Sequence, residues 1–271
     1  MYNVLGVRGL RIGFSATCGF DSIKDVIEFA VEKGFNAAEI NLNVPEFLPE
    51  RYSMDDIKDI KAMLEQNDFW LTFHAPEDIN LCTYQKKLCR SSIDILKDCI
   101  DFAYGLGGKR FTFHAGASVE FTMVDKSLRL EDYYRSEYVG ILKDSIKELI
   151  DYNDARIILC AENAGYFSET KDKAFQHFLG GGLFLTWDIG HAYINKIQMD
   201  FMMKNLKFVR NMHVHDVAGG KDHRIIGTGK VDVPYYMSLV DKDDVSFIIE
   251  VRPAEAAVQS LHELKQLLDL K

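Results

Sequence analysis

The sequence predicts an α/β fold, namely a single (β/α)8 barrel that takes up residues 1–271 as one domain. The chain length is close to the roughly 250 residues typical of such barrels. Short apolar runs alternate with longer segments of helical period, as parallel βα units require. With five prolines and no Ser/Gly-rich tract, the chain has no candidate linker. The alternative is a doubly wound open sheet, which usually contains fewer strands.

The predicted strands are eight short runs rich in aliphatic and aromatic residues. Because most of these runs are apolar throughout, we expect strands that are buried on both faces, as in a parallel sheet. They are Leu10–Ala16, Ala37–Leu42, Trp70–His74, Arg110–His114, Arg156–Glu162, Leu183–Asp188, Val209–His215 and Ser246–Val251.

The predicted helices lie between these strands. The first begins after Asp21, a good N-cap, and ends at Gly34, a residue that readily adopts the left-handed conformation of a helix end. The second carries Asp55 and Asp56 in its first turn, where negative charge is favourable. The predicted helices are Ser22–Lys33, Ser53–Glu65, Gln85–Gly105, Tyr134–Asp151, Lys171–Phe178, Met199–Asn205, Val233–Val240 and Ala254–Leu268.

The bulk properties disfavour several function classes. A formal net charge of −9 argues against a general nucleic-acid binder, because phosphate contacts need basic residues. The five cysteines are odd in number and lack CxxC spacing, so a reduced, cytoplasmic setting is expected. The run of about 18 apolar residues that a membrane-spanning helix needs does not occur, so no membrane partner is expected. Neither G-x-G-x-x-G after the first strand nor G-x-x-x-x-G-K-[ST] is present, so the common nucleotide sites are not predicted.

Ionisable side chains gather where the predicted strands end, which is where barrels carry their chemistry. Any one of them could be a hydrogen-bonded core residue, but several buried carboxylates together need a cation. Imidazole and carboxylate groups are the ligands that Zn, Mn, Co and Fe take, so a divalent-metal site is predicted. The set is Glu39, His74, His114, Glu162, Asp188, His191, His213, His215, Asp216, Asp222, His223, Arg224, Glu250 and Arg252.

Local spacing sharpens this prediction. His213 and His215 are two residues apart on a strand, so both side chains face the same way. Asp188 ends a strand and His191 stands in the following turn, where Gly190 lets the chain bend close to an ion.

Two further residues each have two candidate roles. Glu39 fits equally a structural partner or a substrate contact. Arg252 either orients Glu250 or binds an anionic group of a substrate.

The chain resembles a known superfamily through short motifs that contain these residues. They are Phe73-His74-Ala75-Pro76, Phe113-His114-Ala115-Gly116, Ala161-Glu162-Asn163, Trp187-Asp188-Ile189-Gly190-His191, Met212-His213-Val214-His215-Asp216, Gly227-Thr228-Gly229 and Ile249-Glu250. From Arg11 to Glu250 the chain is similar to the xylose-isomerase-like TIM barrels, which include sugar and sugar-phosphate isomerases and epimerases and also endonuclease IV. The motifs are specific for the superfamily rather than for one branch.

In the isomerase and epimerase branch, the resemblance implies one divalent ion (Mn, Zn, Co or Mg) on Glu162, Asp188, His213 and Glu250. The two glutamates would exchange a proton through an enediolate, and His191 would contact the substrate. The arginine of many ketose epimerases aligns with His223, so Arg224 is the candidate substitute. The candidate substrate-binding residues are His74, His114, His191, His223, Arg224 and Arg252.

In the endonuclease IV branch, the resemblance implies three Zn ions. Eight of the nine ligand positions are matched, by His74, His114, Glu162, Asp188, His191, His213, His223 and Glu250. The ninth position, an aspartate in the nuclease, is Lys221 here, with Asp222 one place later. Glu77 and Asp78 stand where the nuclease inserts an aromatic and an apolar residue into DNA, and they would repel phosphate.

The leading hypothesis is therefore a metal-dependent isomerase or epimerase of a sugar or sugar phosphate. The alternative is a zinc-dependent endonuclease that cuts DNA at abasic sites, which makes nucleic acid the less favoured partner. A binding protein, a lyase or a dehydratase built on the same site is the third option. Exposed helical faces leave a homo-oligomer open.

Overall fold

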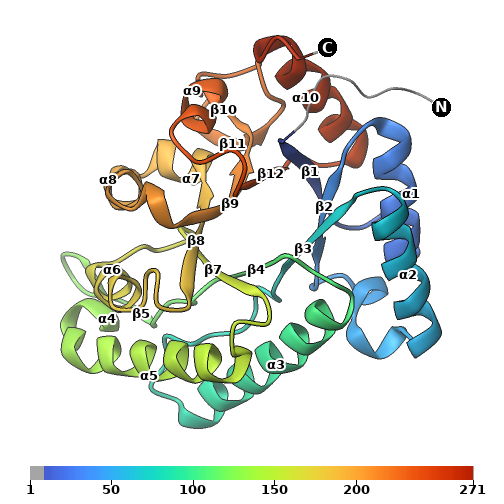
Figure 1. The fold of residues 1–271 in the computed structure, drawn as a ribbon. Coiled ribbons are helices and arrows are strands. Elements are labelled where there is room, and N and C mark those ends of the chain that lie inside the picture. The colour runs from blue at the N-terminus through green and yellow to red at the C-terminus, as the bar shows by residue number, and fades with distance from the viewer. Residues whose placement is uncertain (1–8, 271) are drawn as a thin grey trace.

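The computed structural model describes residues 9–270, so residues 1–8 and 271 of the predicted domain lie outside the described residues. Eight parallel strands form a closed barrel (Figure 1). The pairing of the first strand with the last closes it and excludes the open sheet, so the (β/α)8 prediction is confirmed. In barrel order the strands are β1 (Arg11–Ala16), β2 (Ala37–Asn41), β3 (Trp70–His74), β4 (Arg110–Phe113), β7 (Ile158–Glu162), β8 (Leu183–Asp188), β9 (Val209–Val214) and β12 (Ser246–Ile249).

The eight predicted helices all form, and they surround the barrel (Figure 1). The N-cap of α1 is Ser22 rather than Asp21, because the Ser22 hydroxyl accepts the Asp25 backbone N–H. Gly34 ends α1 in the left-handed conformation, as expected. The bounds are α1 (Ile23–Lys33), α2 (Met54–Gln66), α3 (Lys86–Gly105), α5 (Arg135–Asn153), α6 (Glu169–Gln176), α8 (Lys196–Lys204), α9 (Val233–Ser238) and α10 (Ala254–Leu267).

The connecting segments contain elements that the hydrophobic pattern did not predict, because each is too short to have a period of its own. All except η3, which directly precedes β9, follow a strand and extend the carboxyl end of the barrel. They are η1 (Pro45–Phe47), η2 (Pro49–Arg51), a hairpin of β5 (Glu120–Thr122) and β6 (Ser127–Arg129), α4 (Leu130–Tyr133), α7 (Ile189–Ile194), η3 (Leu206–Phe208), and a hairpin of β10 (Asp216–Ala218) and β11 (Lys221–Arg224).

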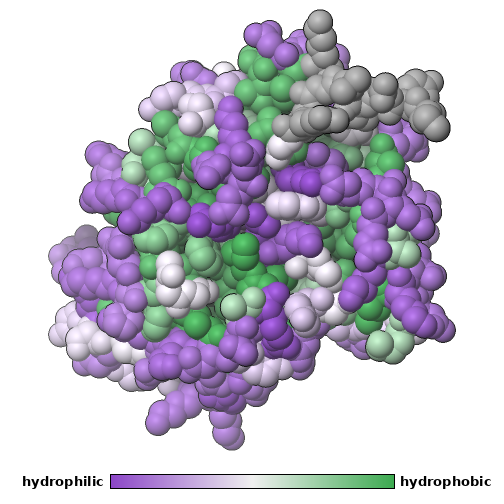
Figure 2. Space-filling model, in the orientation of Figure 1, coloured by the Kyte–Doolittle hydropathy of each residue, from purple (hydrophilic) through white to green (hydrophobic). Residues whose placement is uncertain are grey.

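The apolar core lies between the sheet and the helices, and the inside of the barrel is polar. Alternate residues point outward into the core; Trp187, for example, is fully buried against the Tyr236 ring. Inside, Asn211 donates to Thr112, and Ser246 donates to the Asn211 side-chain oxygen at 2.6 Å. This hydrogen-bonded layer forms a polar floor beneath the carboxyl end. Figure 2 shows hydrophilic residues over most of one face, with hydrophobic patches near its centre.

Candidate metal centre

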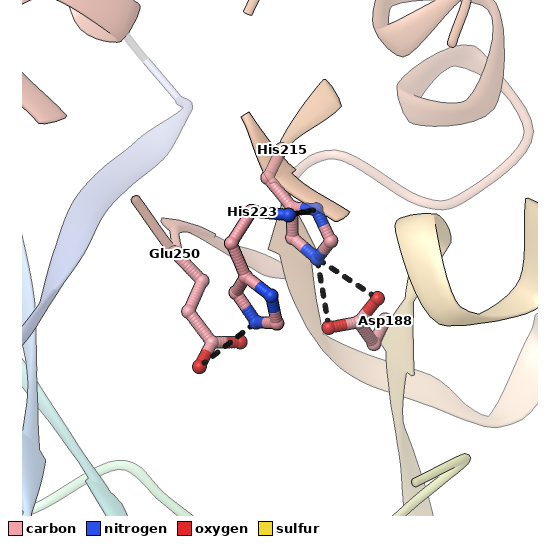
Figure 3. A group of neighbouring side chains, drawn as sticks. All are labelled: Asp188, His215, His223 and Glu250. Atoms are coloured by element: carbon pink, nitrogen blue, oxygen red, sulfur yellow. Dashed lines mark hydrogen bonds and ion pairs between the residues drawn. The ribbon is translucent and has the colours of Figure 1, made fainter. Parts of the chain in front are cut away.

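The predicted ionisable residues converge at the carboxyl end of the barrel. The alternation of side chains along each strand places Glu162, Asp188 and His213 on the inner face. Four groups of donors form, and within each group the donor atoms lie within 4.8 Å of one another. The groups are Glu162, Asp188, His213 and Glu250; His74, His114 and Glu162; His191, Asp222 and His223; and Asp188, His215, His223 and Glu250 (Figure 3).

Glu162 connects two of these groups. One of its oxygens, Oε2, lies 3.2 Å from His74 Nε2 and 3.1 Å from His114 Nε2. The other, Oε1, lies 3.4 Å from His213 Nδ1. The carboxylate is buried at the end of β7, so each oxygen faces a different set of imidazoles. This arrangement suits a carboxylate that bridges the two donor groups.

Glu250 completes the four-donor group from the segment after β12. Its Oε2 lies 3.1 Å from His213 Nδ1. Its Oε1 accepts a hydrogen bond of 2.9 Å from the Arg252 guanidinium. Arg252 therefore orients Glu250, which is one of the two roles expected for it from the sequence.

His213 is held from below by Glu39. The His213 Nε2 atom lies 2.8 Å from Glu39 Oε1, and both side chains are fully buried. The other oxygen of Glu39 accepts from Asn211 in the polar floor at 2.9 Å. A carboxylate behind the far nitrogen of an imidazole fixes the ring and its tautomer, as is common for metal-binding histidines. Of its two expected roles, Glu39 thus has the structural one.

The near nitrogen of His213 is placed among carboxylates. Nδ1 is buried and has no hydrogen-bond partner among the described residues, although Glu162 and Glu250 both lie beside it. A buried polar atom without a partner is unfavourable. The group made of two glutamates, an aspartate and this imidazole therefore fits a divalent cation.

The third group depends on the β10–β11 hairpin. Asp222 Oδ2 lies 3.5 Å from His191 Nε2, and Asp222 Oδ1 lies 3.1 Å from His223 Nδ1. Neighbouring residues of a regular strand face opposite sides, but His223 has a positive φ of 52° that breaks the alternation. Both side chains thus reach the same group, whereas Lys221 is exposed. Asp222 thus supplies, one residue later, the carboxylate that is absent at Lys221.

The sequence singled out Asp216 without a role, and the structure supplies one. Its buried carboxylate accepts the backbone N–H groups of Val217, Gly227, Gly229 and Val231 at 2.7–3.1 Å. A Cβ at Gly229 would approach Asp216 Oδ1 to 2.3 Å, so glycine is required there. Asp216 therefore holds together the loop that carries the hairpin. Arg224, at the end of β11, is exposed.

The carboxylates of the site are strongly ionised. Burial raises the pKa of Glu162, but His213 and His114 outweigh it and leave that pKa well below its ordinary value. Burial also raises the pKa of Glu250, but His213 and His223 outweigh it and hold that pKa well below its usual range. Burial lowers the pKa of His74, yet contact with Glu162 raises it to about 9. The carboxylates are thus in the ionised form in which they bind cations, and a bound cation takes the place of the imidazole protons that pair with them.

A groove of about 710 Å³ opens beside this centre. Arg252 lines it and also contacts Glu250, so the groove adjoins the four-donor group. Its other lining residues are Thr17, Cys18, Asn41, Asn43, Val44, Pro45, Glu77 and Pro253. This size suits a small organic molecule.

The sequence and the fold both match known proteins. A family profile described as xylose isomerase-like TIM barrel matches residues 27–267. The chain belongs to this family. The resemblance expected from the strand-end motifs is confirmed.

The similar proteins include an uncharacterized protein, an epimerase-like protein and an endonuclease. An uncharacterized protein of Methanocaldococcus jannaschii is 26% identical over 217 residues, covering 76% of this chain and 78% of its own. A D-tagatose 3-epimerase-like protein superposes with a TM-score of 0.77 at 22% identity, covering 96% of this chain and 97% of its own. Endonuclease IV of Thermus thermophilus gives a TM-score of 0.72 at 19% identity, with 96% and 99% covered. At these identities the structural matches establish the shared fold.

Within residues 9–270, no helix is both long enough and apolar enough to cross a membrane.

Proposed function

We propose that this chain is a divalent-metal-dependent isomerase or epimerase that acts on a sugar or sugar phosphate. The observation that carries the proposal is the meeting of Glu162 and Glu250 at one imidazole nitrogen, His213 Nδ1, at 3.4 and 3.1 Å. Two carboxylates beside one cation position are what a proton transfer between neighbouring carbons needs.

The donor set supports a metal ion. Three carboxylates and one neutral imidazole suit Mn, Co, Zn or Mg, with Glu162, Asp188, His213 and Glu250 as the ligands. Such an ion, when bound, polarises a carbonyl or hydroxyl oxygen and so acidifies the neighbouring C–H bond.

The residues of the chain then divide the remaining tasks. Glu162 removes the proton from the carbon next to the carbonyl. Glu250, held by Arg252, takes up a proton from solvent and delivers it, to the same carbon in an epimerisation or to the neighbouring carbon in an isomerisation. The His191 ring lies beside the four-donor group, with Nδ1 3.5 Å from Asp188 Oδ2, and is proposed to contact a substrate hydroxyl there. The proposed substrate-binding residues are His74, His114, His191, His223, Arg224 and Arg252.

A sugar is favoured over DNA for two reasons. Glu77 lines the groove and Asp78 beside it in the sequence is also exposed, and these two negative charges disfavour a phosphodiester backbone. Amide and hydroxyl side chains such as Asn41, Asn43 and Thr17 line the same groove and match the hydroxyls of a sugar. Among the structural neighbours, the D-tagatose 3-epimerase-like protein and 3-keto-D-glucoside 4-epimerase from E. coli carry names of the same class.

The test is turnover of a panel of ketoses, hydroxy-ketones and their phosphates with Mn²⁺, Co²⁺, Mg²⁺ or Zn²⁺. Interconversion of one member, with exchange of a carbon-bound proton for solvent deuterium, is the expected result. The Glu250→Gln variant serves as the control, because it keeps the shape of the site and loses one proton carrier. Inactivity toward the whole panel under every ion would overturn the proposal.

A zinc-dependent endonuclease for abasic sites is the second candidate. The observation that favours it is the third donor group, because Asp222 joins His191 and His223 where the sequence alone offered Lys221. Elemental analysis separates the two candidates: one ion per chain supports the isomerase, and three Zn ions support the nuclease. An abasic oligonucleotide left intact by zinc-loaded protein removes the nuclease.

A further inference from the structure

His215 makes contacts on every side of its ring. Its Nε2 lies 3.0 Å from both carboxylate oxygens of Asp188, and its Nδ1 lies 2.9 Å from the backbone nitrogen of His223 (Figure 3). The His223 ring stacks on it, with centroids 4.3 Å apart and planes 11° from parallel. A Cβ at Gly190 would come within 2.0 Å of the His215 ring, so only glycine leaves space for it.

The backbone contact fixes where the proton of His215 sits. The His223 backbone N–H can only donate, so His215 Nδ1 must accept and cannot carry a proton. The carbonyl oxygen of Asp216 lies near the same nitrogen but farther away, at 3.4 Å, so the shorter contact decides. A neutral imidazole then carries its proton on Nε2, and this N–H donates to Asp188.

This placement of the proton decides whether the group in Figure 3 can hold an ion through His215. The group is Asp188, His215, His223 and Glu250. By distance alone the group could hold an ion. A ligating imidazole nitrogen must be free of its proton, however, and Nε2 of His215 is the protonated one. His215 therefore acts on Asp188 rather than on a cation.

We propose that His215 is a positioning residue, which holds the Asp188 carboxylate toward the cation and fastens the β10–β11 hairpin to the same point. This inference rests on the proposed function insofar as Asp188 is taken as a metal ligand. Asp188 is already fixed at its backbone, since the Asn163 side chain bonds both its N–H and its C=O at 2.8 and 2.9 Å. His215 fixes the side chain of Asp188 in the same way. Its contact with the His223 N–H also links Asp188 to the β10–β11 hairpin.

Two substitutions separate the two contacts. In His215→Asn the short side chain can still accept the His223 N–H, but it cannot reach Asp188. In His215→Gln the longer side chain can donate to Asp188, but it loses the backbone contact. Loss of a hydrogen-bond partner of a metal ligand typically weakens metal affinity about 10- to 100-fold.

We therefore expect Co²⁺ titration to give a Kd that is about 10- to 100-fold weaker for His215→Asn, and a smaller change for His215→Gln. Hydrogen exchange of residues 221–224 should rise in His215→Gln and stay low in His215→Asn. Wild-type affinity in His215→Asn would overturn the proposal, as would equal losses in the two variants. A wild-type protein that binds no Co²⁺ would instead overturn the proposed function.

A measurement on the unaltered protein keeps the inference testable even where a variant does not fold. Nitrogen-15 NMR of the histidine rings reports the tautomer directly, with and without Zn²⁺. The expected result is a proton on His215 Nε2 in both states. A proton on Nδ1, or loss of the Nε2 proton when Zn²⁺ is added, would show that His215 is a ligand and would overturn the proposal.

Discussion

The candidate site has two parts that are built differently. Glu162, Asp188 and His213 stand on strands and are almost completely buried above the polar floor. Asp222 and His223 stand on a hairpin, where their side chains are 35% and 29% exposed. The strand-borne part owes its geometry to the closed barrel. The hairpin-borne part depends on two side chains, His215 and Asp216, that hold a short loop in place.

This difference implies a division of roles. Residues locked by packing and a hydrogen-bonded floor can hold a cation with little reorganisation. We expect that the partly exposed hairpin residues can be lost while a cation stays on Glu162, Asp188, His213 and Glu250.

Replacement of Glu162 by Gln should affect the site most. The change removes the carboxylate that faces two donor groups, so turnover should fall by about 10²- to 10⁴-fold, the usual contribution of a general base. The measurement is the rate on the substrate found in the panel, together with Co²⁺ binding. His177→Gln, a histidine at the end of α6 and away from the barrel mouth, is the matched control. Unchanged turnover in Glu162→Gln would contradict the assignment.

The support beneath the strand-borne part can be tested at Glu39. In Glu39→Gln the carboxylate facing His213 Nε2 becomes an amide, which holds the ring less well. Metal affinity should fall about 10- to 100-fold, because the imidazole loses its fixed orientation and basicity. Co²⁺ titration measures this, with the exposed Glu50→Gln as the control. Equal affinities for the two variants would show that Glu39 has no role in the centre.

Asp216→Asn should loosen the hairpin-borne part and leave the strand-borne part unchanged. The amide cannot satisfy four backbone N–H groups, so the free energy of unfolding should fall by about 1–3 kcal/mol. Hydrogen exchange at residues 221–224 should increase, while the ion on the strand-borne ligands stays bound. Loss of that ion along with the hairpin would show that the two parts are one unit.

The smallest effect is expected in the outer shell of helices. Arg90 and Lys97 hold the pKa of Glu148 at about 2, below its ordinary value. A lowered pKa in the folded state stabilises the protein above about pH 4.5, and this stabilisation is lost as the pH falls toward 2. Because the ion pair is partly exposed, its contribution should be below about 1 kcal/mol. Thermal unfolding of Glu148→Gln between pH 7 and 3 should show a flatter pH dependence than the wild type, and parallel curves would contradict this.

The same division explains what the sequence could predict. Strand-end residues such as Glu162 and His213 were predictable, because the alternation of side chains and the closure of the barrel follow from the apolar pattern. Asp222 belonged to the predicted ionisable set, but its meeting with His191 and His223 was not predictable, because it depends on the positive φ of the next residue. The role of His215 depends on a backbone N–H eight residues later, and hydrophobic periodicity carries no information about such a contact. The extra hairpins and the Ser22 cap were not predicted for the same reason, because short local hydrogen bonds determine them. Whether the chain forms a homo-oligomer stays a prediction.

The proposed cation site can be located by anomalous diffraction from crystals of the protein grown with Mn²⁺ or Zn²⁺. We expect a strong anomalous peak bounded by Glu162, Asp188, His213 and Glu250, with His215 outside its coordination sphere. A strong peak elsewhere, or none at these four residues in metal-loaded crystals, would contradict it.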